Sequence, residues 1–415
     1  MEELIIKGKK AKEASYFLAQ ASTAGKNQIL DHVAETLINE SGNILKANQN
    51  DMINAEKAGL KGAIMDRLLL TEERIVSMAE GLKEIAALED PVGEVLAMRK
   101  RPNGLIIGQK RVPMGVIGII YESRPNVTAD VFGLCLKTGN ATILRGGKEA
   151  YASNLAITSI IQNVLAENGF PAECLQLVEN TSRESAVALM QLDQYLDLLI
   201  PRGGAGLIRT VVENSHVPVI ETGVGNCHIY VDDSADLEKA LAITINAKIQ
   251  RPGVCNAAES LLVHQNVARE FLPQVGTELL KHQVEIRGDK AVCQLIDGAK
   301  PATEKDWGTE FLDLIISAAV VSSMDDAISH IQRYGSGHSE AIITENYSRA
   351  QTFLDKVDAA AVYINASTRF TDGFEFGFGA EIGISTQKLH ARGPMGLKEL
   401  TSTKYIIYGD GQIRE

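Results

Sequence analysis

The fold is decided by residues 112–150, which read VPMGVIGIIYESRPNVTADVFGLCLKTGNATILRGGKEA. The apolar run Gly115–Tyr121 predicts a buried strand, and Ala141–Leu144 predicts a second one. From here onward strand and helix patterns alternate. Such alternation is typical of a parallel, doubly wound sheet that binds ligands at its carboxyl edge.

The alternation continues toward the C-terminus in two series. The first series is expected to contain a helix from Ser153 to Leu165, a strand at Leu175–Val178, a helix at Ser182–Met190, a strand at Leu196–Ile200, a helix at Gly203–Val212 and a strand at Val217–Ile220. The second series is expected to place strands at His228–Val231, Ser260–Val263, Leu314–Val321, Ala341–Thr344 and Ala361–Ile364. Two α/β lobes are therefore predicted.

The two ends of the chain show sequence patterns other than this alternation of strands and helices. The first ninety residues are predicted to be helical, with a helix after Thr71 that is capped by its hydroxyl and by Glu72 and Glu73. Pro102-Asn103-Gly104 predicts a β-hairpin turn, and LTSTKYIIYG near the C-terminus predicts a strand. Exposed strand edges attract partners, so we expect the hairpin and this strand to form a subunit contact. Pairing within the chain is the alternative.

Composition favours a soluble globular protein. The chain is 45% hydrophobic and 23% charged, and its net charge of −12 argues against broad nucleic-acid binding. The five cysteines are scattered without CxxC pairs, so neither a disulfide framework nor a metal site is expected. The N-terminus lacks a signal-peptide core, and no apolar run approaches the roughly 18 residues of a membrane span. A cytoplasmic location is expected.

The sharpest chemical feature is QRPGVCNAAES at residues 250–260. Asn256, Ala257, Ala258 and Glu259 are expected to begin a helix, which places Cys255 at a helix N-terminus. The helix dipole would favour a thiolate there, and the free amides would hold an oxyanion. An inert buried thiol is the alternative for an arbitrary cysteine, but this context favours a nucleophile.

Other segments suggest a carboxylate and a cofactor site. Glu221 follows an apolar strand and precedes glycines, which is typical of a site residue at a strand end, although a solvated loop glutamate is the alternative. No GxGxxG motif follows the first strand. Instead, Gly203 and Gly204 open a helix that can bind an anion, and Arg145 and Lys148 follow a strand. Cations at this place favour NADP over NAD.

With these segments in place, the chain resembles the aldehyde dehydrogenase superfamily over essentially its whole length. The resemblance rests on residues 112–150, LLIPRGGAGLI (198–208), VIETGVGNCHIYVD (219–232), QRPGVCNAAESLLVH (250–264) and VYINASTRFTDGFEFGFGAEIGIST (362–386). It implies an aldehyde dehydrogenase-like α/β fold with an NADP-binding domain at 1–226, a hairpin for oligomerisation at about 94–113, a catalytic domain at 227–390 and a C-terminal helix and strand at 391–415.

The resemblance also implies roles for individual residues. Cys255 is implied as the nucleophile, Glu221 as the counterpart of a base that hydrolyses thioesters in relatives, and Glu310 as the ligand of the nicotinamide ribose. Arg124 stands where the superfamily has its oxyanion asparagine, with Asn126 two residues on. The loop NASTRFTDG is expected to bind the substrate, with Ser367, Thr368 and Arg369 for a carboxylate and Asp372 for an ammonium group. Arg124 is a rival for the carboxylate.

The implied reaction is the NADPH-dependent reduction of L-glutamyl 5-phosphate to L-glutamate 5-semialdehyde through a cysteine thioester, the second step of proline biosynthesis. A homo-oligomer and an association with a separate glutamate 5-kinase are the expected partners. The competing interpretations are an oxidising, hydrolytic aldehyde dehydrogenase, a catalytically silent protein on this fold and a fragment of a bifunctional kinase–reductase.

Overall fold

The computed structural model describes residues 1–414, and the chain divides into two compact units. The first unit comprises residues 1–222, 377–383 and the chain from 395 onward, and the second comprises residues 223–376 and 384–394. No helix in the described part of the chain is long and apolar enough to cross a membrane.

The first unit is built around a parallel sheet with the strand order β5-β4-β3-β6. Its strands are β3 (Val116–Tyr121), β4 (Ala141–Gly146), β5 (Leu175–Leu177) and β6 (Leu198–Arg202). Its helices are α1 (Glu2–Leu18), α2 (Thr23–Asn39), α3 (Ser41–Lys57), α4 (Ala63–Leu68), α5 (Glu72–Ala87), α6 (Val127–Lys137), α7 (Tyr151–Glu167), α8 (Arg183–Met190) and α9 (Ala205–Asn214), with the 3₁₀ turns η1 (Lys148–Ala150), η2 (Ala172–Cys174) and η4 (Lys398–Leu400).

The sequence explains why this sheet forms. Every residue of β3 and β4 is buried, as expected for parallel strands covered on both faces. Helices α1, α6, α7 and α9 contact the strands, and α2, α3 and α5 add a further layer against α6 and α7. The predicted cap of α5 is confirmed: the Thr71 side chain accepts a hydrogen bond from the Arg74 N–H, and two glutamates lie in the first turn.

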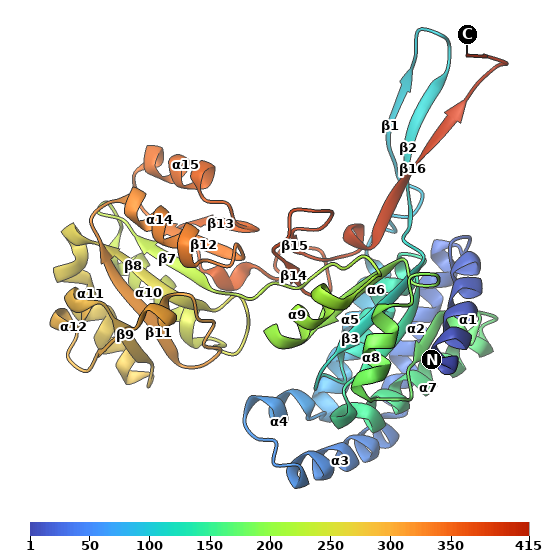
Figure 1. Ribbon diagram of the computed structural model, residues 1–415, viewed down its shortest axis with the longest axis horizontal. Coiled ribbons are helices and arrows are strands. Elements are labelled where there is room, and N and C mark those ends of the chain that lie inside the picture. Colours follow the sequence, from blue (N-terminus) through green and yellow to red (C-terminus); the bar gives the residue numbers. More distant parts are fainter. Residues whose placement is uncertain (415) are drawn as a thin grey trace. The chain divides into compact units, whose positions relative to one another are not determined.

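A separate three-stranded sheet joins distant parts of the chain. Strands β1 (Val95–Lys100) and β2 (Ile106–Pro113) form the predicted hairpin, and β16 (Thr401–Tyr408) pairs antiparallel with β2 along its whole length (cyan and red in Figure 1). The hairpin and the C-terminal strand therefore pair within the chain. The outer edges of β1 and β16 have no strand neighbour among residues 1–414, so the expected subunit contact stays a prediction for those edges.

The second unit has a seven-stranded parallel sheet with the order β10-β9-β11-β8-β7-β12-β13. Its strands are β7 (Cys227–Val231), β8 (Ala258–His264), β9 (Glu285–Gly288), β10 (Lys300–Pro301), β11 (Ile315–Val321), β12 (Ser339–Ile343) and β13 (Ala361–Ile364), with a small antiparallel pair β14 (Ile384–Ser385) and β15 (Gly393–Pro394). Its helices are α10 (Leu237–Ile249), α11 (Gln265–Lys281), α12 (Lys290–Leu295), α13 (Glu304–Trp307), α14 (Met324–Tyr334) and α15 (Tyr347–Lys356), with the 3₁₀ turn η3 (Thr368–Phe370).

Alternating strand residues build two cores in this unit. Ile229 and Val231 pack with α10, α11 and α12 on one face of the sheet, whereas Tyr230 packs with α14 and α15 on the other. Helices thus cover both faces, which confirms the predicted second α/β lobe.

One predicted strand is wrong. Val217–Ile220 forms only an isolated bridge between Val219 and Leu199, beyond the edge strand β6. Pro218 has no N–H to donate, so a regular ladder cannot extend through this segment.

Candidate active site

Cys255 differs from most of the other cysteines in its exposure. Cys255 is a partly exposed residue, as is Cys293, whereas Cys135, Cys174 and Cys227 are buried. Burial raises the pKa of Cys135 and Cys174 to about 12 and that of Cys227 well above its usual value. Because the thiolate is the reactive form, the three buried thiols are poor nucleophiles at neutral pH.

Residues 250–257, here named the Cys255 turn, join α10 to β8, and they do not begin a helix. The expected helix from Asn256 is wrong, because β8 starts at Ala258 and lies between β7 and β11 in the sheet. Pairing on both sides of the strand outweighs the local helix preference of Asn-Ala-Ala-Glu. The expected support of a Cys255 thiolate by a helix dipole and by helix amides is therefore wrong as well.

The segment before β7 packs directly against the Cys255 backbone. A Cβ atom at Gly225 would lie only 1.6 Å from the carbonyl oxygen of Cys255, so no larger residue fits there without displacement. The Cys227 thiol donates a hydrogen bond to the same carbonyl over 3.2 Å. The position of Cys255 is thus fixed by a segment that lies far from it in the sequence.

Glu310 belongs to the same constellation. It lies in the loop that leads into β11, and its Oε1 accepts a hydrogen bond from the Gly225 N–H at 2.8 Å. The structure therefore brings the predicted ribose ligand and the backbone of the predicted nucleophile into contact with the same glycine, Gly225.

The predicted substrate loop, residues 365–373, packs on the Cys255 turn. The Asn256 Nδ2 donates to the carbonyl oxygens of Thr371 and Arg369, and the Thr368 hydroxyl donates to the Asn256 carbonyl at 2.7 Å. The Arg369 guanidinium donates to the Asn256 side chain and to Gln250 Oε1 at 2.7 Å. Asn256 is thus the link between nucleophile and loop, and its polar side chain directly after Cys255 is the sequence signal for it.

The four predicted substrate residues of this loop differ in what they offer. Arg369 is half-buried, and burial together with the neighbouring cation of Arg251 lowers its pKa. Ser367 and Thr368 are buried, and the Ser367 hydroxyl accepts a hydrogen bond from the Arg369 N–H. Asp372 is partly buried and accepts from the Phe374 N–H at 2.9 Å. The two hydroxyls shape the loop, which leaves Arg369 and Asp372 as the charged groups.

A chain of side-chain contacts that the sequence did not reveal runs behind the nucleophile. His338 Nδ1 lies 3.6 Å from the Cys227 sulfur and 2.8 Å from the Ser339 hydroxyl. That hydroxyl contacts Thr371 Oγ1 at 2.7 Å, and Thr371 contacts the Tyr363 hydroxyl at 2.7 Å. The chain ties β12 and β13 to the substrate loop, which supports a structural role for His338.

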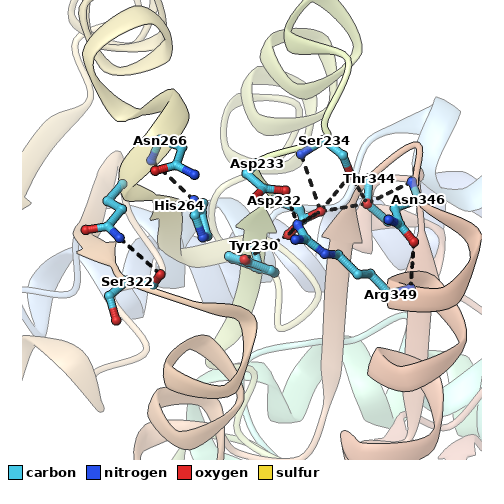
Figure 2. A network of polar contacts seen from close by, with 11 residues as sticks. Tyr230, Asp232, Asp233, Ser234, His264, Asn266, Ser322, Thr344, Asn346 and Arg349 are labelled. Carbon is cyan, nitrogen blue, oxygen red and sulfur yellow. Dashed lines mark hydrogen bonds and ion pairs between the residues drawn. The ribbon is translucent and has the colours of Figure 1, made fainter.

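A second polar cluster of this unit lies where β7, β8 and β12 end (Figure 2). Asp232 is fully buried and accepts hydrogen bonds from Arg349, Ser234, Thr344 and the Tyr230 hydroxyl. Burial by itself would raise the pKa of Asp232, but the hydrogen bonds outweigh it and the pKa is lowered. The hydrogen bonds to the buried Asp232 carboxylate all come from within the network, so we regard it as structural. Cys255, in contrast, lies just before β8 begins.

In the first unit, the strand order changes direction between β3 and β6, and loops follow both strands at their carboxyl ends. This is the place where doubly wound sheets bind ligands. Gly204 caps α9, and its N–H donates to Glu122 Oε2 at 3.2 Å. A Cβ at Gly204 would meet nothing within 4 Å, so the helix start borders open space. A Cβ at Gly203 would lie 2.5 Å from Glu122 Oε2.

The two predicted cations at this edge of the sheet, Arg145 and Lys148, differ in their burial. Arg145 is nearly buried, and its Nη2 donates to the carbonyl oxygens of Thr181 and Ser182 at 2.7 Å each. Lys148 lies in η1, just after β4, and is exposed. The glycine-bordered helix start and the exposed lysine fit a phosphorylated dinucleotide. Lys148 is thus the exposed cation of this edge, whereas Arg145 braces the loop before α8.

The remaining predicted residues of the first unit lie after β3 and β6. Asn126 occupies the N-cap position of α6, and its Nδ2 donates to Asp130 Oδ2 at 2.9 Å. Burial raises the pKa of that carboxyl to about 6. Arg124 lies in the loop between β3 and α6, and Glu221 is half-buried in the segment that follows the bridge at Val219. No group of three metal-ligating side chains is present in the part of the chain that the structure describes.

Both the sequence and the fold are similar to those of known proteins. The model of the family described as "Aldehyde dehydrogenase family" matches residues 6–296. The chain is 62% identical to the γ-glutamyl phosphate reductase of Carboxydothermus hydrogenoformans over 414 residues, with 100% of both chains covered. The crystal structure of γ-glutamyl phosphate reductase from Thermotoga maritima superposes with a TM-score of 0.97 at 53% identity and covers 100% of both chains.

A more distant solved structure shares the fold. An engineered glycolyl-CoA reductase with bound NADP⁺ has a TM-score of 0.69 at 16% identity, with 97% of this chain and 96% of that chain covered. The expected aldehyde dehydrogenase-like fold is thus confirmed. The chain belongs to the aldehyde dehydrogenase family and, within it, to the γ-glutamyl phosphate reductases.

Proposed function

We propose that this oxidoreductase converts L-glutamyl 5-phosphate to L-glutamate 5-semialdehyde and phosphate with NADPH, through a thioester on Cys255. This reaction is the second step of proline biosynthesis from glutamate, and we place it in the cytoplasm. The observation that carries the proposal is the Cys255 turn, where the partly exposed Cys255 packs against Gly225, which binds Glu310, and where the neighbouring Asn256 contacts Arg369.

The first step forms the thioester. The Cys255 thiolate attacks the γ-carbonyl carbon of the acyl phosphate, a carbon–sulfur bond forms, and the bond to the phosphate oxygen breaks with its electron pair on phosphate. Negative charge collects on the carbonyl oxygen during the attack and needs a donor. We assign this role to the Cys255 backbone N–H. Asn126 is the weaker candidate, because one of its amide hydrogens is directed to Asp130.

The second step reduces the thioester. When bound, NADPH supplies the hydride for the thioester carbon. The tetrahedral species then collapses to the aldehyde and returns the electron pair of the carbon–sulfur bond to Cys255. Water has no part in either step and must be excluded, because hydrolysis of the thioester would waste the activated substrate. Glu221 therefore has no water to activate in this direction, unlike the matching glutamate of oxidising relatives.

Substrate recognition is assigned to the loop beside the nucleophile. The planar guanidinium of Arg369 suits the α-carboxylate, because its fork can bind both oxygens. Asp372, which lies three residues on, suits the α-ammonium group. Ser367 and Thr368 hold this loop in shape, and Arg124 is the rival cation for the carboxylate.

The cofactor is assigned to the edge of the first sheet and to Glu310. Gly203 and Gly204 would hold the pyrophosphate at the start of α9, and Lys148 would bind the 2′-phosphate that distinguishes NADP from NAD. Arg145 would support that site through the loop it braces. Glu310 would bind the hydroxyls of the nicotinamide ribose.

Two partners complete the proposal. The outer edges of β1 and β16 pair with no other strand within residues 1–414, and such edges favour a homo-oligomer because they attract further strands. A glutamate 5-kinase would supply the acyl phosphate, and its association with this enzyme would shorten the path of a labile intermediate.

The proposal is tested in the reverse direction with glutamate semialdehyde, NADP and phosphate. We expect NADPH formation to require phosphate in the wild type and to vanish in Cys255→Ser, with the variant folded by circular dichroism. Oxidation that proceeds equally without phosphate would instead identify a hydrolytic aldehyde dehydrogenase. Full activity of Cys255→Ser would refute the nucleophile.

A further inference from the structure

A buried ion pair is formed by two residues that flank Cys255 in the sequence. Lys248 lies in the last turn of α10 and Glu259 is the second residue of β8, so one partner precedes Cys255 and the other follows it. Lys248 Nζ and Glu259 Oε2 are 2.6 Å apart, and both side chains have 0% exposure. The pair therefore joins the two ends of the turn inside the second unit.

The other oxygen of the same carboxylate holds the loop that carries Glu310. Glu259 Oε1 accepts a hydrogen bond from the Leu312 N–H at 3.0 Å. Leu312 has a φ of +55°, a left-handed conformation that is uncommon for a residue with a branched side chain. The strained backbone is thus fixed by a carboxylate at the point where the loop turns toward β11.

These contacts form a ring that includes both Cys255 and Glu310. Glu259 holds Leu312, the same loop places Glu310, Glu310 accepts from the Gly225 N–H, and Gly225 packs on the Cys255 carbonyl. Every member of this ring lies in the second unit. A displacement at Glu259 would therefore move the Glu310 loop and the Cys255 turn together.

Stability alone is a poor reason for such a pair. Taking a lysine and a glutamate out of water is costly, and well-packed apolar residues at the same place are often as stable or more so. The geometry points to a different use: we infer that Lys248 and Glu259 are positioning residues that set the placement of Cys255 and of Glu310. The inference rests on the proposed function, because it assigns the reaction to Cys255 and cofactor binding to Glu310.

The experiment compares this pair with a matched buried pair elsewhere. The test variant is Lys248→Met/Glu259→Gln, which removes both charges and keeps the side-chain lengths. The control is Lys26→Met/Asp90→Asn in the first unit, where the ion pair is 2.5 Å long, both side chains are buried, and Asp90 also accepts a backbone N–H, from Val92 at 2.9 Å. No residue of the control pair has a role in the proposed site.

Three readouts are needed. The melting temperature reports folding, quenching of NADPH fluorescence reports cofactor affinity without turnover, and the rate of Cys255 alkylation by iodoacetamide from pH 6 to 9 reports the environment of the thiol. We expect the test variant to bind NADPH about 10- to 100-fold more weakly, because this is the effect of losing a hydrogen bond to a charged group such as the Glu310 carboxylate. We also expect a shifted alkylation profile, because the Cys255 turn would move. The control variant should change the melting temperature only.

A folded test variant with wild-type NADPH affinity and a wild-type alkylation profile would overturn the inference, as would a control that changes both equally. If the test variant does not fold, Glu259→Asp replaces it, since this change keeps the charge and draws the carboxylate back by one methylene. A folded Glu259→Asp protein that matches the wild type in both readouts overturns the inference too. Neither readout depends on turnover, so a failure of the proposed reaction would be recognised separately in the phosphate-dependent assay.

Discussion

Gly225→Ala adds a single carbon atom beside the Cys255 backbone and should strongly impair the active site. The new Cβ would lie 1.6 Å from the Cys255 carbonyl oxygen and 2.5 Å from its Cα. Since non-bonded carbon atoms settle at about 3.5–4.0 Å, Cys255 and this segment would have to separate by at least about 1 Å. A misplacement of that size costs roughly 100-fold in rate. Because the clashing atoms belong to the backbone, overpacking should lower the free energy of unfolding by about 3 kcal/mol, the upper end of the usual range.

The assay is phosphate-dependent NADP reduction by glutamate semialdehyde, measured as kcat alongside urea unfolding. Gly308→Ala is the control in the same unit, because a Cβ there meets nothing within 4 Å. We expect kcat of Gly225→Ala to fall about 100-fold while the protein stays folded, and Gly308→Ala to match the wild type. A folded Gly225→Ala enzyme with wild-type kcat would show that the placement of Cys255 does not depend on this contact.

Three further substitutions test substrate binding, cofactor binding and folding stability one at a time. Arg369→Lys should raise KM for glutamate semialdehyde about tenfold or more, because hydrogen bonds to charged groups contribute roughly 1.5–3 kcal/mol. An unchanged KM would show that another cation, such as Arg124, binds the α-carboxylate of the substrate. Lys148→Ala should weaken NADP binding by up to about fivefold, the range of an exposed ion pair, and leave NAD binding unaltered; an equal loss for both cofactors would contradict a 2′-phosphate contact. Asp130 has its pKa raised by burial to about 6 in the folded protein, against 3.8 for the ordinary group, so its ionisation opposes folding. Its destabilising effect is absent below pH 3.8, grows between these values and is complete above about pH 6. Urea unfolding from pH 4 to pH 7.5 should show that Asp130→Asn gains roughly 3 kcal/mol relative to the wild type across this range, whereas parallel pH profiles would refute the assignment.

Local patterns in the sequence predicted those elements that depend mainly on interactions between residues close together in the chain. The continuous apolar run of β3 and the shorter predicted strand of β4 are both fully buried, and Thr71 caps α5 as expected. The hairpin turn at Pro102-Asn103-Gly104 could also be predicted from the sequence, because turns of this kind need glycine at a left-handed position. Gly104 has a φ of +90°.

What the sequence could not show depends on pairing between distant strands. The segment after Cys255 has a helix-like composition, yet its place between β7 and β11 makes it strand β8. The contact of Gly225 with the Cys255 carbonyl arises because β7 and β8 are neighbours although α10 separates them in the chain. The Lys248–Glu259 pair was hidden for the same reason: a lysine and a glutamate in sequence say nothing of being buried together.

The most direct test of the account is to catch the acyl group on the enzyme. The protein is incubated with glutamate semialdehyde and NADP in the absence of phosphate, quenched in acid and analysed by peptide mass spectrometry. We predict a glutamyl thioester on the peptide that contains Cys255, which disappears when phosphate is added before the quench. A reaction that turns over while this peptide stays unmodified, or an adduct on another cysteine such as Cys293, would contradict the account.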